Sequence, residues 1–252
     1  MTKEFRLPPF DLRLAMNTLA AKDPQLAPLI KETEEFRIED DGSGSPYEIL
    51  VEAITHQSIS GKAAATIFGR IKALGSNDLV PSPEEMLKLR KPALRKAGLS
   101  GAKILAMKDL AQKTIDGVVP TLEQAEKLSD EDLVERLVSV RGIGAWTVEM
   151  FLIFRLGRPD VLPIHDLGVK KGWSVTYGKK YMPKPKELLA FGERWRPYRT
   201  VASWYMWRAC QRAGNAALRK IRPAPTRRRG PAKLRRKRAN LKPPKASRSR
   251  RK

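Results

Sequence analysis

The sequence predicts an all-α protein, and three observations support this fold class. Apolar residues recur every three to four positions through most of residues 45–215, which is the period of a helix buried on one face. Serine or threonine often precedes these runs, followed by a proline or an acid, as at helix starts. Strand-like alternation is scarce, residues 34–40 being the only weak candidate, and no repeat of fixed period occurs.

The first clear helix begins at Pro46. Ser45 is a suitable cap, proline fits the first helical position, and Glu48 stands where an acid completes a capping box. Tyr47, Leu50 and Ile54 then form the expected buried stripe. Similar patterns predict helices over residues 62–74, from residue 82 onward, over 102–114 and over 121–128.

The second half of the chain continues the helical pattern. Ser129, followed by three acids, predicts a helix start, and the apolar spacing carries that helix to Val138. Gly142 and Gly144 interrupt the pattern, which resumes over residues 145–156. Further helices are predicted over 167–177, 186–195 and 200–213, with Gly214 as a stop signal.

The two-glycine turn predicts a binding site for DNA phosphate. Glycine lets a backbone turn sharply and approach another molecule, and the amides that open the next helix carry partial positive charge. A lone Gly-x-Gly would favour an ordinary turn between packed helices. The flanking pattern, with Leu137 before the turn and Thr147 after it, matches a helix-hairpin-helix over its full length and favours DNA binding. The turn itself is Gly142, Ile143 and Gly144.

A single carboxylate follows the hairpin by about one helix. Asp166 ends the loop that starts at Leu162 and precedes an apolar helical run. It is either a helix N-cap or a catalytic group that stabilises the positive charge formed on a sugar during glycosidic cleavage. One residue can do both. His165 either contacts phosphate or tunes Asp166, or is a neutral surface residue.

In these segments the chain resembles the helix-hairpin-helix (HhH-GPD) DNA glycosylases, and most of all their 3-methyladenine DNA glycosylase II branch. The resemblance covers roughly residues 10–215 and implies two helical lobes with the active cleft between them. It also implies extrusion of a damaged base and hydrolysis of its glycosidic bond. The matching segments are residues 52–64, 97–100, the hairpin, 162–166 and 196–207.

The resemblance assigns roles to several residues. Asp166 falls on the catalytic aspartate, while Trp146 and Trp207 fall on aromatic positions of the base pocket. Met150 stands where some relatives have an aromatic residue, which leaves the shape of the pocket open. Core packing is the alternative for every tryptophan, and we expect it for Trp173 and Trp195.

Other positions are implied to meet DNA or a cation. His56, Gln57 and Ser58 would border the minor groove and the lesion, with a solvated loop as the alternative. The segment that enters the gap left by the base maps near residues 99–101, that is Leu99, Ser100 and Gly101, where no bulky residue is evident. The resemblance also implies a monovalent cation at backbone carbonyls near Val140 and Gly142, as in relatives.

Position 146 predicts that the enzyme leaves the strand intact. Lyase-type members of the superfamily use a lysine nucleophile at the position of Trp146. Lys170 and Lys171 are the nearest lysines to the loop, one to two turns into the following helix. A single cysteine excludes a four-cysteine iron–sulfur cluster, and two distant histidines make zinc improbable, so we expect no required cofactor.

The positive charge is concentrated at the C-terminus. Of 50 Lys and Arg residues, 17 lie in residues 219–252, where no acid occurs. We expect a lead segment over 1–44, without the N-terminal β domain of some relatives, a glycosylase core over 45–215 and a disordered basic tail over 216–252. The tail would add non-specific affinity for DNA, or serve as a solubilising or RNA-binding extension.

Together these features predict a monomeric, monofunctional glycosylase that removes alkylated purines from double-stranded DNA. No run of eighteen apolar residues and no signal region occurs, so we expect no membrane span and a nucleoid or cytoplasmic location, or a nuclear one in a eukaryote. A non-enzymatic DNA-binding module and a bifunctional glycosylase/lyase are the alternatives. The lesion range stays open among 3-methyladenine, 7-methylguanine, ethenoadenine and hypoxanthine.

Overall fold

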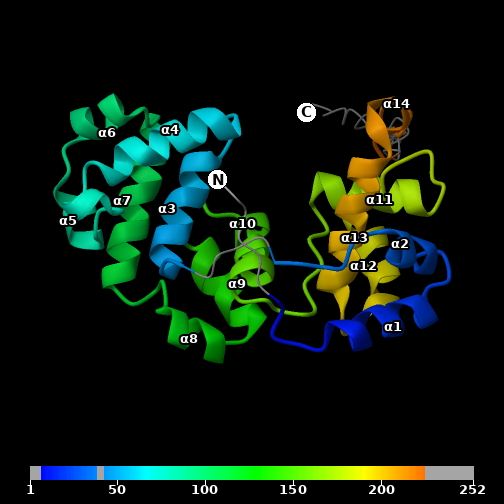
Figure 1. Ribbon diagram of the computed structural model, residues 1–252. Coiled ribbons are helices and arrows are strands. Elements are labelled where there is room, and N and C mark those ends of the chain that lie inside the picture. The colour runs from blue at the N-terminus through cyan, green and yellow to red at the C-terminus, as the bar shows by residue number, and fades with distance from the viewer. Residues whose placement is uncertain (1–6, 39–42, 225–252) are drawn as a thin grey trace, which may run out of the picture.

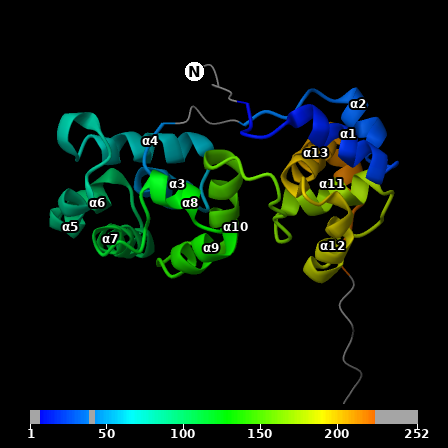
Figure 2. The ribbon, with the colours of Figure 1, turned by 90° about the horizontal axis from the view of Figure 1, so that it is seen from below.

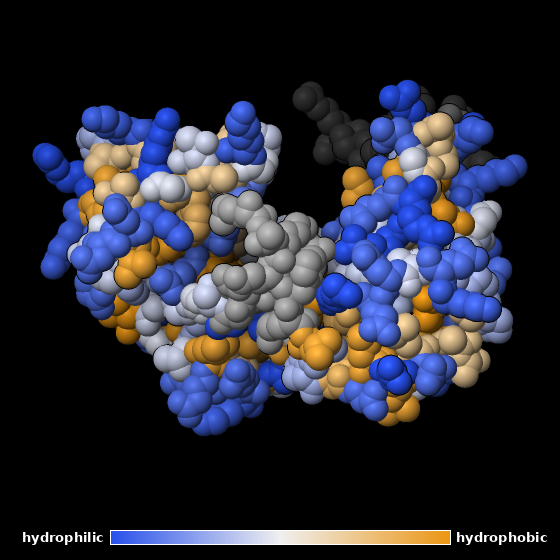
Figure 3. All heavy atoms as spheres, in the orientation of Figure 1, coloured by the Kyte–Doolittle hydropathy of each residue, from blue (hydrophilic) through white to orange (hydrophobic). Residues whose placement is uncertain are grey.

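The computed structural model describes residues 7–38 and 43–224. Within these ranges the chain forms helices and no named strand, which confirms the all-α prediction. Two helical lobes stand side by side, and both views show the chain passing between them (Figures 1 and 2). The surface is hollowed between the lobes (Figure 3).

The first lobe contains the hairpin. Its core joins side chains of the long helices α3 and α7 to those of the hairpin helices α9 and α10. Leu50, Leu110 and Leu137 are completely buried there, so the predicted apolar stripes do face one another. The helices of this lobe are α3 (Pro46–His56), α4 (Gly61–Lys72), α5 (Pro83–Lys88), α6 (Lys91–Ala97), α7 (Gly101–Ile115), α8 (Leu122–Lys127), α9 (Asp130–Val138) and α10 (Ala145–Met150), with a short 3-10 turn at Ser76–Asp78.

The second lobe combines both ends of the described chain. Helices α1 and α2, which come from the predicted lead segment 1–44, pack against α13. The expected core tryptophans Trp173 and Trp195 are both buried. The helices are α1 (Leu12–Lys22), α2 (Ala27–Glu32), α11 (Leu167–Thr176), α12 (Pro185–Gly192), α13 (Arg199–Arg212) and α14 (Gly214–Arg219), with a 3-10 turn at Glu193–Trp195.

A buried carboxylate holds three parts of the second lobe together. Asp23, directly after α1, is 1% exposed. Its Oδ2 accepts hydrogen bonds from the Tyr177 hydroxyl at 2.6 Å and from the Trp195 indole at 3.0 Å. Because both aromatic donors are buried, this acceptor satisfies polar groups that would otherwise be left without a partner.

Helix starts were the most predictable feature of the fold. Ser45 and Ser82 both form complete capping boxes, with Glu48 and Glu85 returning a hydrogen bond to the cap backbone. Four helices were not predicted, namely α1, α2, α6 and α14. Three of these have only six or seven residues, too few for a helical period to stand out. Residues 34–38 form no strand, and residues 39–40 lie outside the described ranges.

The helix predicted over residues 145–156 is interrupted. It is α-helical to Met150 and then widens into a π-helix over Phe151–Arg155. The widened turn places buried Arg155 so that its guanidinium donates to the carbonyl of Gly44 at 2.9 Å. Such widened turns are uncommon and often lie at functional sites.

The prediction that the chain becomes disordered at residue 216 is wrong. Gly214, with a φ of +68°, ends α13, but the chain continues as α14. Arg222 then pairs with the segment before α12, its amide donating to the carbonyl of Lys180 at 3.0 Å. Composition missed these contacts because they are tertiary. Residues 225–252 of the predicted tail lie outside the described residues. No helix in the described part is long and apolar enough to cross a membrane.

Candidate active site

Asp166 lies at the start of α11, on the loop that connects the two lobes. It has the extended backbone of an N-cap, and its Oδ1 accepts the amide of Val169 at 2.7 Å. Its own amide donates to the carbonyl of Pro163 at 2.9 Å, which closes the turn. The N-cap alternative is therefore correct as a description of structure, and it leaves the carboxylate free to accept further donors.

Two indole groups donate hydrogen bonds to the same carboxylate. The Nε1 of Trp146 donates to Oδ2 at 2.8 Å, and the Nε1 of Trp207 donates to Oδ1 at 2.8 Å. The structure thus brings together, from α10, α13 and the connecting loop, the three residues that the sequence singled out. These donors fix both carboxylate oxygens in place. Trp146 remains 47% exposed, so its ring is available to a ligand.

Trp207 packs against Phe154, a residue that was not predicted from the sequence. The Phe154 ring stacks on it at 5.7 Å between centroids and 19° between planes. Met150 is half-buried and packs on the core of the first lobe, on the same helix as Trp146. The faces of two indoles and a thioether suit a flat aromatic ligand, and the role of these three side chains as a pocket wall stays a prediction.

Close helix packing places Trp207 against Asp166. A Cβ on Gly168 would lie 2.7 Å from the Trp207 ring, and one on Gly172 would lie 1.8 Å from the carbonyl oxygen of Met206. Only glycine fits at these two positions of α11, one turn apart and facing α13. Gly-x-x-x-Gly was visible in the sequence as a signal for such packing.

The hairpin has the predicted form. Gly142 has a φ of +80° and the Ile143 amide donates to the carbonyl of Val140 at 3.0 Å, closing the turn between α9 and α10. Gly144 is the N-cap of α10, and no side chain caps that end. The side chains of Ile143 and Thr147 are buried, so this segment offers its backbone, rather than these side chains, to a partner.

Other side chains brace the hairpin. The Gln57 side-chain amide donates to the carbonyl of Gly142 at 2.9 Å, joining the loop after α3 to the turn. On α7, the Asp109 carboxylate accepts the Arg141 amide at 2.7 Å and pairs with Lys113 at 3.0 Å. Lys113 also donates to the carbonyl of Ser139. The roles of Asp109 and Lys113 were not predicted, because nothing in their local sequence indicates that their backbone partners lie in the distant hairpin.

The remaining predicted DNA contacts lie on the first lobe and the connecting loop. His56 is exposed and lies 3.7 Å from Glu52, Ser58 has a left-handed backbone with a φ of +59°, and His165 is exposed beside Asp166. These positions are accessible, and their contacts with DNA stay predictions.

The predicted gap-filling segment is partly wrong. Leu99 is 2% exposed and belongs to the core of the first lobe, so its side chain does not reach DNA. Gly98, with a φ of +111°, turns the chain so that the Leu99 amide donates to the carbonyl of Leu94. This cap geometry places the following apolar residue inward. Ser100 caps α7, which begins at Gly101.

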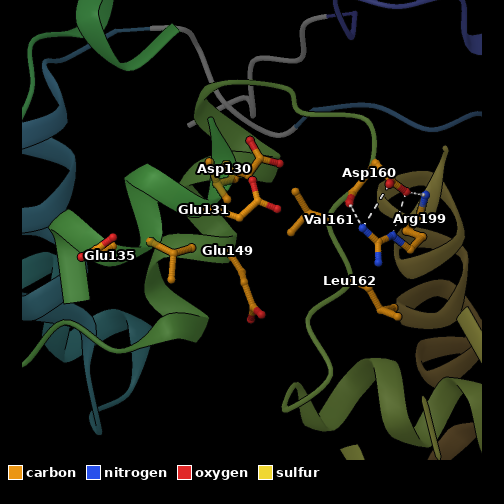
Figure 4. Close-up of a pocket in the computed structure, with 10 residues that line it drawn as sticks. Asp130, Glu131, Glu135, Glu149, Asp160, Val161, Leu162 and Arg199 are labelled. Atoms are coloured by element: carbon orange, nitrogen blue, oxygen red, sulfur yellow. Dashed lines mark hydrogen bonds and ion pairs between the residues drawn. The ribbon is translucent and has the colours of Figure 1, made fainter. Parts of the chain in front are cut away.

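A cavity of about 400 Å³ lies between the lobes. Figure 4 shows Glu149 extending from α10 into this space, with Asp160 and Arg199 on the opposite side. The Arg199 guanidinium pairs with Asp160 at 2.8 Å. Burial, together with the charge of Asp166, raises the pKa of Glu149 to about 7. Sequence reasoning did not identify Glu149, because its environment is created only when the lobes meet.

Comparison with known proteins gives consistent matches. The family model of the HhH-GPD superfamily of base excision DNA repair proteins matches residues 51–197. DNA-3-methyladenine glycosylase 1 of Schizosaccharomyces pombe is 42% identical over 168 residues, covering 67% of this chain and 74% of that protein. Among solved structures, the Schizosaccharomyces pombe 3-methyladenine DNA glycosylase Mag1 in complex with abasic DNA has a TM-score of 0.69 at 38% identity, covering 77% of this chain and 95% of that one. The DNA-3-methyladenine glycosidase of Bacillus halodurans has a TM-score of 0.71 at 32% identity, covering 82% and 94%.

Proposed function

We propose that this chain, which belongs to the HhH-GPD superfamily of base excision DNA repair proteins, excises alkylated purines of the 3-methyladenine type from double-stranded DNA. It is a DNA glycosylase that hydrolyses the bond between base and sugar. Two of the relatives that match over most of their length, from Schizosaccharomyces pombe and Bacillus halodurans, carry the name 3-methyladenine glycosylase or glycosidase. That shared name supports the substrate class.

The contact of Trp146 and Trp207 with Asp166 is the observation that carries this proposal. An extruded alkylpurine is electron-poor and would stack on the indole faces. Its sugar then lies near the carboxylate, whose negative charge stabilises the positive charge that develops as the glycosidic bond breaks. Water completes the hydrolysis at the same sugar carbon. Asp166 is the catalytic residue in this proposal, and Met150 completes the wall beside the base.

Excision without strand cleavage follows from the residue at position 146. A lyase requires an amine close to the sugar, and Trp146 fills that place with an indole bonded to Asp166. Lys170 and Lys171 follow in α11. The Lys170 backbone amide donates to the Asp166 carbonyl at 3.1 Å, but among the described contacts neither lysine ammonium group bonds to the Asp166 carboxylate. The product is therefore an intact strand with an abasic site.

DNA would approach along the side where the hairpin and Asp166 both lie. The uncapped start of α10 offers backbone amides from Gly144 onward to a phosphate, while His56 and Ser58 border the lesion. A monomer suffices, because the described cleft is built from a single chain. The predicted basic tail would add salt-sensitive affinity, and the site of action would be the nucleoid or the nucleus.

The proposal requires no cofactor. The carbonyls of Val140 and Gly142 each accept one hydrogen bond and keep a second lone pair, so they fit the monovalent cation considered at the hairpin. Such a cation would add positive charge beside a bound phosphate. Among the described residues no group of three or more His, Cys, Asp or Glu side chains could hold a metal.

Base release from methylated duplex DNA tests the proposal. The full chain is incubated with duplex treated with a methylating agent, the released bases are separated, and strand breaks are scored with and without alkali. We expect release of 3-methyladenine and breaks only after alkali. Breaks without alkali would contradict the monofunctional reaction, and DNA binding without release of any methylated purine would contradict the substrate class.

A further inference from the structure

Glu149 is a half-buried acid that lines the cavity between the lobes, and the proposed reaction assigns it no role. It lies three residues after Trp146 and directly before Met150, so it shares a face of α10 with the first indole. Its Oε2 is inaccessible to solvent and has no hydrogen-bond partner among the described residues. A buried oxygen without a partner is rare in a folded protein, and the side chain that carries this one lines the cavity between the lobes.

The surroundings of Glu149 favour its neutral form. Burial is the largest influence on it, followed by the charge of Asp166, and together they raise the pKa of Glu149 to about 7. The Asp160 carboxylate across the cavity is compensated by Arg199, and no cation is bonded to Glu149 in the described structure. The charged groups that line the same cavity are Asp130, Glu131, Glu135, Asp160 and Arg199.

We propose that Glu149 is a second acid of this site and gives its proton to the leaving purine when that purine carries no positive charge. This inference rests on the proposed function, because it needs an extruded purine between Trp146 and Trp207. A neutral carboxyl group can both donate and accept a hydrogen bond. It therefore matches the edge of a purine, where ring nitrogens accept hydrogen bonds and the exocyclic groups differ from one purine to another. Hypoxanthine is an uncharged purine on which this role of Glu149 is tested.

The reaction balances as an acid-assisted hydrolysis. The Glu149 proton passes to a ring nitrogen of the base while the bond between C1′ and N9 breaks, so the base leaves as a neutral molecule. Water forms the new bond to C1′ and loses a proton to solvent. Asp166 stabilises the charge on the sugar meanwhile, and Glu149 regains a proton from solvent. A purine methylated at N7 already carries the charge that this proton supplies.

The test compares a neutral and a charged substrate in one pH series. Single-turnover release of hypoxanthine and of 7-methylguanine from duplex DNA is measured between pH 5 and pH 9 for the full chain and for Glu149→Gln, where pH values are chosen around the Glu149 pKa of about 7. The acid is protonated below that value, so wild-type release of hypoxanthine should fall about tenfold per pH unit above it. In the variant this fall should disappear, and release at pH 6 should drop about 100-fold.

The comparison of substrates separates chemistry from folding. A structural role for Glu149 predicts equal losses on both substrates, whereas proton donation predicts a loss on hypoxanthine at least about tenfold larger than on 7-methylguanine. Glu135→Gln is the matched control, because Glu135 lines the same cavity from α9 and is exposed. It should leave both profiles unchanged.

Three results would overturn the inference. They are an unchanged pH profile in Glu149→Gln, equal losses on the two substrates, and no release of hypoxanthine by the wild-type chain at any pH. Each of these leaves excision of 7-methylguanine intact as evidence for the proposed function. Conversely, failure of the wild-type chain to release any methylated purine would count against the proposed function itself.

Discussion

Replacement of Asp166 by asparagine separates the two roles of this residue. Asparagine is as good an N-cap as aspartate, so its oxygen can still accept the Val169 amide and the Trp207 indole. Its amide nitrogen would then face the Trp146 indole, donor against donor. Because Trp146 is 47% exposed, its N–H can turn to water, and we expect a loss of only about 1 kcal/mol in the free energy of unfolding.

The effect on catalysis should be much larger than the effect on stability. A carboxylate about 4 Å from a sugar cation, at an effective dielectric constant of about 20, contributes about 4 kcal/mol of attraction. Asparagine removes that charge. Since about 1.4 kcal/mol corresponds to a tenfold change in rate, Asp166→Asn should slow base release about 1,000-fold.

The assay measures single-turnover release of 7-methylguanine at saturating protein, together with the thermal midpoint. A loss of about 1 kcal/mol lowers the midpoint by roughly 2–4 °C for a chain of this size. Asp11→Asn is the matched control. Asp11 is also an aspartate N-cap, since it caps α1 by accepting the amide of Leu14 at 2.9 Å, and it lies far from Asp166 in the sequence. More than about a tenth of wild-type release in Asp166→Asn would refute electrostatic catalysis by this carboxylate and leave it as a cap.

Three further predictions concern stability and DNA binding. Asp23→Ala leaves the Tyr177 and Trp195 donors buried without an acceptor, so urea denaturation should show a loss of about 3 kcal/mol. Lys113→Met removes the bond to the Ser139 carbonyl that braces the hairpin, and fluorescence anisotropy should show duplex affinity weakened about fivefold, about 1 kcal/mol, with the saturated rate of base release retained. Deleting residues 225–252 removes most of the basic tail, so the logarithm of affinity should fall less steeply with the logarithm of salt concentration. An unchanged denaturation midpoint would contradict the first prediction, and an unchanged duplex affinity the second. An unchanged slope of affinity against salt concentration would contradict the third.

Local chemistry made much of the fold and part of the site predictable. Serine caps and acid-first turns report helix starts because the responsible hydrogen bonds span only three residues, as at Ser45 and Ser129. The hairpin was equally predictable, because Gly142 and Gly144 act through their own backbones. Asp166 was found because a cap position and a family motif coincide in one short loop.

Features created by tertiary contact were not predictable. Leu99 was expected at the DNA surface, but the left-handed turn at Gly98 folds it into the core. Phe154 stacks on Trp207 only because the two lobes meet, more than fifty positions apart in sequence. Glu149 reads as an ordinary surface glutamate on a short helix, and its environment depends on burial in the cleft.

The geometry at Asp166 explains why one carboxylate can be both structural and reactive. Among the described residues, the Val169 amide and the Trp207 indole both donate to Oδ1, while Oδ2 accepts only the exposed Trp146 indole. A base that enters between the indoles therefore meets a carboxylate with two donors on Oδ1 and one donor, from a half-exposed side chain, on Oδ2. Because Gly168 lets α11 approach Trp207 closely, the bond from the Trp207 indole to Oδ1 depends on helix packing rather than on a mobile loop. Gly168→Ala should then reduce base release by displacing Trp207, even though alanine favours helix formation.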